Sequence, residues 1–270
     1  MILSTTPSLE GKKAVKYAPV KRPANLNKRP AMPAPGILLS DAGFSVPGKV
    51  ILAGITADLT QHRIGILGRN GSGKSTLLRL MAGLIAPTSG SVSISGLDPA
   101  GDRKAMLSQI GILFQNPDHQ ILFPTVIEEL SFGLRQMGHP DPAARAAGIL
   151  AADGRPHWGP AATHSLSQGQ RHYLCLLSIL AMEPATILLD EPLAGLDLPT
   201  RTRLARRFAA LPQRLITVTH DPETVETCDR VLWLDGGQIR ADGPAAAVIA
   251  AFRHEMARLG EADADTDLTG

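Results

Sequence analysis

The sequence predicts an α/β fold with a mostly parallel sheet at its core. Two observations lead to this prediction: short apolar runs alternate with helical stretches, and a glycine-rich segment joins one such run directly to a helix. Residues 37–54 and 91–95 look instead like antiparallel strands that lie beside that core. A chain of 270 residues is long enough to bury a sizeable core.

The strands are predicted as follows, in chain order. Antiparallel strands are expected in residues 37–54 and 91–95. The parallel strands are expected at the apolar runs, which are residues 63–67, 110–114, 186–189, 215–219 and 231–234. The turn Asp235-Gly236-Gly237 is then expected to close a hairpin with residues 238–240.

The two ends of the chain differ from the rest. Residues 1–36 hold seven lysines and arginines, one acid and six prolines, without sustained periodicity, so they are predicted to be disordered. A floppy extension, or a true start at Met32, is the favoured interpretation; a basic arm that touches anionic lipid is the alternative. Residues 259–270 are predicted to form a flexible acidic tail.

Composition excludes several classes of protein. The formal charge of +2 is too small to argue for nucleic acid. The longest apolar runs fall far short of the ~20 residues that cross a bilayer, and no signal peptide follows Met1. Cys175 and Cys228 give no disulfide framework and are predicted to be structural. We therefore expect a cytoplasmic chain.

A phosphate-binding loop follows the strand at residues 64–67 and precedes a helix at residues 77–82. Its glycines let backbone N–H groups close around phosphates, and the helix N-terminus adds positive potential. Lys74 would reach the β- and γ-phosphates, and the Ser75 hydroxyl would ligate Mg²⁺. The alternative, a chance glycine-rich turn, does not account for the strand-to-helix context. The loop consists of Gly68, Arg69, Asn70, Gly71, Ser72, Gly73, Lys74, Ser75 and Thr76.

Two acids and a histidine follow other predicted strands. Asp190 and Glu191 end the apolar run at residues 185–189. Asp190 would hold Mg²⁺ through water, and Glu191 would orient and deprotonate an attacking water. His220 follows the strand at residues 215–219, at the sheet edge where ligands of open α/β sheets bind.

A second anion site is predicted far along the chain from the phosphate-binding loop. The segment Leu166-Ser167-Gln168-Gly169-Gln170 opens a helix that runs through residues 174–182. Ser167 is a natural N-cap, and the N–H groups after it form an anion site. The phosphate-binding loop already cradles one nucleotide by itself.

In their order, these motifs resemble the ABC ATPase family over roughly residues 37–250. The resemblance implies an ABC ATPase domain at residues 37–258. Its P-loop NTPase fold would have a mostly parallel core, an antiparallel β subdomain and a helical signature subdomain at about residues 116–180. In the family two copies face head to tail, and each signature caps the γ-phosphate held by the other copy. A homodimer held together by ATP is therefore expected.

The resemblance also implies a role for each motif. The catalytic residues would be Glu191, the switch histidine His220 and the Q-loop glutamine Gln115. The Mg²⁺ ligands would be Ser75, Gln115 and Asp190. Besides the loop at residues 68–76, ATP would contact Ser167, Gln168, Gly169, Gln170 and the D-loop residue Asp197.

The chain departs from the family pattern at two positions. Gln168 stands where the commonest signature has glycine; since only the backbone and Ser167 need touch phosphate, the change should be tolerated. Val46 occupies the position that usually carries an adenine-stacking aromatic, and Phe44 is expected to pack into the core instead. Base recognition is therefore expected to be weak.

Two classes of ABC machine compete, a transporter motor and a soluble ABC ATPase of translation or DNA maintenance. The chain has room for one ATPase unit, whereas the translation factors carry two. Only about ninety residues separate Lys74 from Ser167, without the heptad run of a long coiled coil. A transport role is therefore favoured, and no nucleic-acid partner is expected.

Residues 114–129 resemble the energy-coupling-factor importers of vitamins and of cobalt or nickel ions. Residues 63–68, which lead into the phosphate-binding loop, look most like the biotin-importer ATPases, with a cobalt or nickel importer as the alternative. The resemblance implies an integral-membrane coupling subunit and a substrate-binding membrane subunit as partners. The chain would then lie peripherally at the cytoplasmic face of the inner membrane.

Ile121, Leu122 and Phe123 follow Gln115 closely and suggest an apolar groove for a partner's helix. The alternative is that residues 121–127 are only the start of a core helix.

Overall fold

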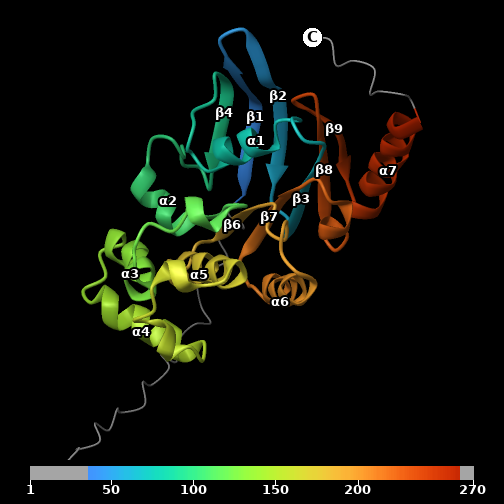
Figure 1. Ribbon diagram of the computed structural model, residues 1–270. Coiled ribbons are helices and arrows are strands. Elements are labelled where there is room, and N and C mark those ends of the chain that lie inside the picture. Colours follow the sequence, from blue (N-terminus) through green and yellow to red (C-terminus); the bar gives the residue numbers. More distant parts are fainter. Residues whose placement is uncertain (1–35, 262–270) are drawn as a thin grey trace, which may run out of the picture. The chain divides into compact units, whose positions relative to one another are not determined.

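The computed structural model describes residues 36–261 (Figure 1). The interpretations of residues 1–35, as a basic arm or as a stretch before a start at Met32, lie outside these residues. The predicted acidic tail lies outside them from residue 262 onward. Helix α7 (Ala245–Glu261) takes in residues 259–261, so the first three residues assigned to that tail are helical.

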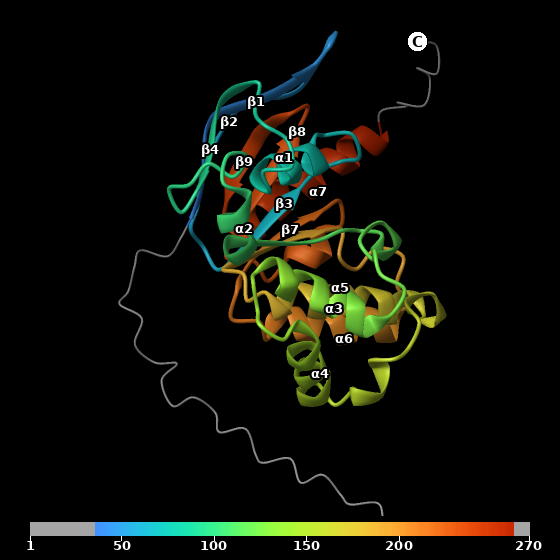
Figure 2. The same ribbon diagram turned by 90° about the vertical axis from the view of Figure 1, so that its left-hand side faces the viewer.

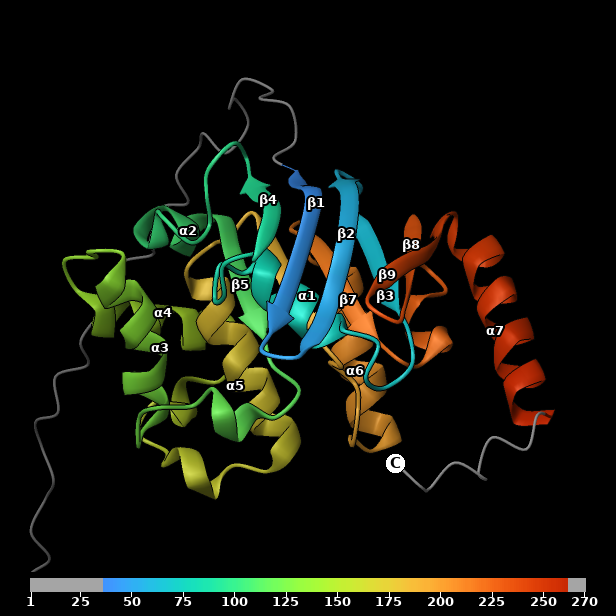
Figure 3. The ribbon, with the colours of Figure 1, turned by 90° about the horizontal axis from the view of Figure 1, so that it is seen from above.

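The antiparallel strands form a three-stranded sheet in the order β2-β1-β4, seen side by side in Figure 3. Ile37 of the middle strand pairs with Leu59 on one side and with Ile94 on the other. The predicted antiparallel strands are present, and the second continues past residue 54, where we expected it to end. The strands are β1 (Ile37–Val46), β2 (Lys49–Leu59) and β4 (Ser89–Ile94).

The larger sheet has six strands in the order β5-β6-β7-β3-β8-β9. Its first five strands are parallel, and β9 pairs antiparallel with β8. Gly236 and Gly237 turn this last hairpin with φ of 54° and 78°, as a two-residue type I′ loop requires. The predicted parallel core and hairpin are confirmed. The strands are β3 (Arg63–Leu67), β5 (Ile110–Leu113), β6 (Thr186–Asp190), β7 (Arg214–Thr219), β8 (Arg230–Asp235) and β9 (Gln238–Gly243).

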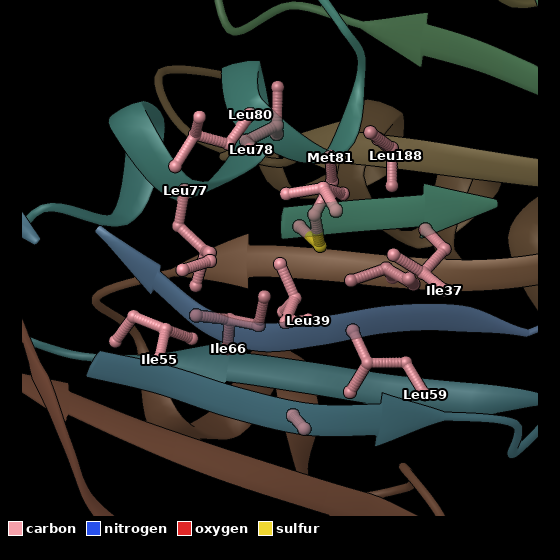
Figure 4. Packing of buried hydrophobic residues seen from close by; sticks show 14 of the residues in the cluster. Ile37, Leu39, Ile55, Leu59, Ile66, Leu77, Leu78, Leu80, Met81 and Leu188 are labelled. Atoms are coloured by element: carbon pink, nitrogen blue, oxygen red, sulfur yellow. The ribbon is translucent and has the colours of Figure 1, made fainter. Parts of the chain in front are cut away.

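Helix α1 (Lys74–Met81) contacts both sheets and shares one hydrophobic core with them. It begins at Lys74, three residues before the helix start expected from the sequence. Fully burying a side chain such as leucine stabilises the fold by about 1.5–3 kcal/mol, so this core holds the helix firmly. Figure 4 shows its side chains Leu77, Leu78, Leu80 and Met81 packed among strand residues that include Ile37, Leu39, Ile55 and Ile66.

Three helices pack around a core of their own, which includes the fully buried Val126, Leu130 and Leu174. They lie almost entirely within residues 116–180, where a helical subdomain is predicted. In Figures 1 and 2 they lie, with α6, on the side away from the antiparallel sheet. The helices are α3 (Val126–Gln136), α4 (Pro142–Ala152) and α5 (Gln168–Ala181), joined by the short helices η1 (Pro117–His119), η2 (Pro156–Trp158) and η3 (Thr163–Ser165).

Helix α5 also connects this helical core to the larger sheet. Its residues Cys175, Leu176 and Ile179 are buried against β5, β6 and β7, while Leu174 and Leu177 face α3 and α4. The remaining helices are α2 (Arg103–Gln109), α6 (Leu198–Ala209), η4 (Pro222–Val225) and α7, which packs on β8. Within residues 36–261, no helix combines the length and apolar character needed to cross a membrane.

Candidate nucleotide site

The loop between β3 and α1 lies so close to neighbouring backbone that glycine is required. A Cβ on Gly68 would lie 2.3 Å from the carbonyl oxygen of Leu234. Gly73 has φ of 101° and is the N-cap of α1, and it provides no side-chain cap. The first N–H groups of α1 are therefore left for another acceptor, as expected where a helix N-terminus binds phosphate.

Lys74 is the buried cation of this loop. Its Nζ donates to the carbonyl oxygens of Gly68 at 2.8 Å and Arg69 at 2.9 Å. Burial lowers the pKa of Lys74, while the negative charges of Glu191 and Asp190 oppose that shift. The ammonium is thus held at the mouth of the loop, facing two acids from another strand.

Asp190 at the end of β6 lies beside Ser75 in the first turn of α1. Burial raises the pKa of Asp190, and the charge of Glu191 adds to the rise. Arg79 and Lys74 oppose it, as does a hydrogen bond with the Ser75 hydroxyl. The structure therefore brings together two of the three oxygen-bearing side chains expected to ligate Mg²⁺.

Glu191 presents its carboxylate from an unusual backbone conformation, with φ of 45°. One carboxylate oxygen accepts hydrogen bonds from the backbone N–H and the ring Nδ1 of His220, at 2.9 and 2.7 Å. The other accepts from the hydroxyl of Thr219 at 2.9 Å. The side chain of Glu191 is 12% exposed and that of His220 is 52% exposed, so the acid is fixed and the imidazole faces the open site.

Lys74, Ser75, Glu191 and His220 line one cleft of about 470 Å³. Gln115 reaches it from the segment after β5, and Ile51 reaches it from β2. Among the residues that the structure describes, no phenylalanine, tyrosine or tryptophan lines this cleft. Val46 is 41% exposed and lies outside it, and Phe44 packs against the core as predicted. The lining residues are Ile51, Asn70, Gly71, Gly73, Lys74, Ser75, Thr76, Gln115, Glu191 and His220.

Ser167 lies at a different hollow, at the N-terminus of α5. Its hydroxyl accepts from the N–H of Gln170 at 3.3 Å, and the Gln170 side chain accepts from the N–H of Ser167 at 2.8 Å. This capping box fixes the start of the helix. The hollow is lined by Arg155, Trp158, Ser167, Gly169, Gln170, Tyr173, Thr200, Arg203 and Leu204, none of which lines the Lys74 cleft.

Residues 54–194 match the family model described as ABC transporter. The chain belongs to the ABC transporter family. It is an ATP-binding and ATP-hydrolysing member, as the sequence predicted, and its hydrolysis is coupled to transport.

Two similar proteins have names that describe a transport role within this family. The chain is 52% identical over 219 residues to the "Biotin transport ATP-binding protein BioM" of Rhodobacter capsulatus, covering 80% of this chain and 94% of that protein. It is 40% identical to the protein of the same name from Rhizobium etli, covering 80% and 97%. These relatives agree with the predicted similarity to energy-coupling-factor ATPases.

Solved ABC structures share the fold. The structure of cbiO1 from Clostridium perfringens, described as part of the ABC transporter complex cbiONQ, has a TM-score of 0.69 at 30% identity and covers 83% of this chain and 96% of that one. A dimeric ATP-binding cassette, MJ0796 with ADP and Pi, has a TM-score of 0.66 at 22% identity, covering 77% and 98%. The predicted P-loop NTPase fold of the ABC type is confirmed.

The segment predicted to be the Q-loop is held at its base by a residue that the sequence did not single out. The side chain of Gln120 accepts from the N–H of Phe114 at 3.1 Å and donates to the carbonyl of Ile112 at 3.0 Å. Gln115 itself is exposed. The loop therefore has a fixed base and a free glutamine at its tip.

The apolar run after the Q-loop is divided between core and surface. Ile121 packs against both helical and sheet cores, and the Phe123 ring lies 5.1 Å from that of Phe132. Leu122 is 68% exposed. The buried carboxylate of Glu129 accepts from the N–H groups of Leu122 and Phe123, both at 2.9 Å, and thereby fixes the exposed leucine.

The residues predicted to form the D-loop and the signature lie at the starts of α6 and α5. Asp197 caps α6 by accepting from the N–H of Thr200 at 2.8 Å. Hydrogen bonds from the side chain and then the backbone of Thr200 lower the pKa of Asp197. Gln168 lies beside Gly195, since a Cβ on that glycine would be 3.7 Å from the Gln168 amide nitrogen.

Both cysteines are buried or half-buried. Burial raises the pKa of Cys175 to about 12 and that of Cys228 to about 11, which suits structural thiols.

Sequence reasoning missed two residues of the site. Ile51 belongs to the antiparallel sheet, and only tertiary packing brings it to the cleft. Thr219 directly precedes His220, so its position at the strand end was visible in the sequence, but its bond to Glu191 was not.

Proposed function

We propose that this chain is the ATP-hydrolysing subunit of an energy-coupling-factor ABC importer that transports biotin. The observation that carries the proposal is the convergence of Lys74, Glu191 and His220 on one cleft. Asp190 lies beside Ser75, which lines the same cleft. The assignment of biotin rests on the BioM relative, which is 52% identical over 80% of this chain.

The cleft supports hydrolysis by an in-line attack of water on the γ-phosphate. The loop and Lys74 bind the phosphates, and the N-terminus of α1 complements their charge. Glu191 takes the proton of the water as its oxygen bonds to phosphorus and the bond to ADP breaks. His220 orients that carboxylate through its 2.7 Å hydrogen bond.

The residues fit a magnesium ion. The contact between Ser75 and Asp190 offers one hydroxyl and one carboxylate, and Gln115 adds an amide oxygen at the same cleft. Among the described residues, no cluster of three acids, histidines or cysteines would hold a metal by itself. That pattern suits Mg²⁺, which binds one or two protein oxygens together with substrate phosphates and neutralises their charge.

A second copy of the chain would complete the site. The helix N-terminus at Ser167 is an anion site that opens on a hollow separate from the Lys74 cleft. A head-to-tail homodimer would place each Ser167, with Gly169, against the nucleotide of the other copy. The D-loop residue Asp197 and the loop residues 68–76 would then lie at the same interface.

Membrane chains would bind the surface that carries Leu122. A leucine that is 68% exposed, and is held by the buried Glu129, suits a partner's apolar helix. The partners would be a coupling subunit and a substrate-binding subunit in the inner membrane, with this chain at their cytoplasmic face.

Uptake of labelled biotin by cells tests the proposal. Deleting the gene should abolish high-affinity uptake, the wild-type chain should restore it, and the Lys74→Ala variant should not. Uptake of labelled nickel and cobalt ions tests the alternative importer. Loss of metal uptake with normal biotin uptake would overturn the assignment of biotin.

A further inference from the structure

We infer that Thr219 is a positioning residue for hydrolysis, because its hydroxyl fixes the carboxylate of Glu191 in the orientation of a base. The inference rests on the role proposed above for Glu191. It adds a residue that belongs to none of the motifs recognised in the sequence.

The hydroxyl of Thr219 has only one possible orientation. Its oxygen accepts a hydrogen bond from the N–H of Asp221 at 3.0 Å. Its single hydrogen is therefore free to point to Glu191, whose Oε2 lies 2.9 Å away. Thr219 is 1% exposed, so water does not compete for either bond.

The two oxygens of the Glu191 carboxylate are held unequally. Oε1 accepts two hydrogen bonds from His220, whereas Oε2 accepts from Thr219. Together these three hydrogen bonds hold both oxygens of the carboxylate in place. Removal of the hydroxyl would leave Oε2 without this donor.

Thr219 is also anchored to the rest of the site. Its carbonyl oxygen accepts from the N–H of Gly68, the first residue of the phosphate-binding loop, at 3.3 Å. Asp221, which orders its hydroxyl, pairs with Arg201 of α6 at 3.3 Å. The threonine thus connects the phosphate-binding loop to the acid that activates water.

Several charged groups face Glu191 from the elements packed around it. They are Lys74 of the loop, Asp190 of β6, His220 after β7, and Arg201 and Asp221 across a second hollow that Glu191 also lines. A Thr219→Val substitution leaves all of them in place, so a fall in its kcat reports on the lost hydroxyl.

The test compares Thr219→Val and Thr219→Ser in the full chain by steady-state ATP hydrolysis. In Thr219→Val, Oε2 of Glu191 loses its hydrogen-bond donor, so the carboxylate is held less firmly. We therefore expect kcat to fall by about tenfold to a hundredfold. The KM for ATP and the binding of ADP should stay within twofold. Thr219→Ser should restore kcat.

Thr217→Val is the matched control, because Thr217 is a buried threonine two residues earlier on β7. An equal loss of kcat in Thr217→Val and Thr219→Val would reduce Thr219 to a structural role and overturn the inference. A Thr219→Val enzyme with near-normal kcat would also overturn it. If Thr219→Val melts too early for assay, Thr219→Ala is judged by the same criteria.

A double variant separates this inference from the role of Glu191. In single-turnover assays, adding Thr219→Val to Glu191→Gln should slow hydrolysis no further, since the threonine acts through the glutamate. A further tenfold loss would show that Thr219 acts elsewhere. Near-normal turnover by Glu191→Gln alone would overturn the proposed base, and the inference about Thr219 would fall with it.

Discussion

Nδ1 of His220 lies 2.7 Å from Oε1 of Glu191, so an exposed imidazole and a nearly buried carboxylate share one hydrogen bond. Because an ionised carboxylate only accepts, the Nδ1 of His220 carries the proton and donates it. Nε2 then remains available on the side that faces the cleft. The pair links the acid that would activate water to the end of β7.

His220→Ala should therefore impair hydrolysis more than binding. We expect kcat to fall by about 10²-fold, the lower end of the range for a positioned acid–base group, with ATP affinity nearly unchanged. Steady-state hydrolysis and nucleotide titration measure the two effects. His254→Ala, an exposed histidine on α7, is the control and should behave as wild type. A loss of affinity equal to the loss of kcat would contradict the orienting role.

Lys74→Ala should lose tight nucleotide binding. The ammonium would contact phosphate directly, and such charged hydrogen bonds contribute about 1.5–3 kcal/mol, or roughly tenfold to a hundredfold in Kd. Calorimetric titration with ATP measures the change. Lys104→Ala, an exposed lysine on α2, should bind ATP normally. ATP affinity within twofold of wild type in Lys74→Ala would disprove the contact.

GTP should compete nearly as well as ATP. No phenylalanine, tyrosine or tryptophan lines the described cleft, and the stacking of such a ring on a base contributes about 1–3 kcal/mol. Competition of GTP against a fluorescent ATP analogue measures the preference. Val46→Tyr should raise the preference for ATP if Val46 occupies the stacking position. A preference for ATP well above tenfold in the wild type would show that some ring stacks on the base.

Leu122→Asp should separate assembly from catalysis. Its side chain is 68% exposed, so the charge should not disturb folding, whereas Phe123 stacks on Phe132 and is a poorer choice. We expect normal hydrolysis by the isolated chain and loss of co-purification with its membrane subunits. Leu84→Asp, at a leucine that is 50% exposed, is the matched control. Intact assembly of Leu122→Asp would place the membrane contact elsewhere.

The parts of the fold that depend on local pattern were predictable. Alternating apolar runs predicted the parallel strands, and the motif at residues 68–76 predicted the loop because it is contained in nine consecutive residues. Ser167 was predictable as an N-cap for the same reason. These features depend on neighbours within a few residues of each other.

The parts that depend on long-range packing were not predictable. Ile51 reaches the cleft only because the antiparallel sheet packs on α1, and Gln120 closes the Q-loop through side-chain contacts. The apolar run at residues 121–123 reads as one patch in the sequence. In the structure, Ile121 and Phe123 turn toward neighbouring side chains and Leu122 turns outward, because Glu129 holds their backbone.

The central claim is that the Lys74 cleft of one copy and the Ser167 hollow of another form one ATP site. It is tested most directly by the mass of Glu191→Gln in solution, measured by light scattering with and without ATP. We expect a monomer without nucleotide and a stable dimer with ATP, since hydrolysis should slow by ~10²–10⁴-fold. Adding Ser167→Arg should abolish the dimer, whereas adding Ser91→Arg, at an exposed serine of β4, should not. A monomer with ATP, or a dimer that forms equally well with Ser167→Arg, would contradict the account.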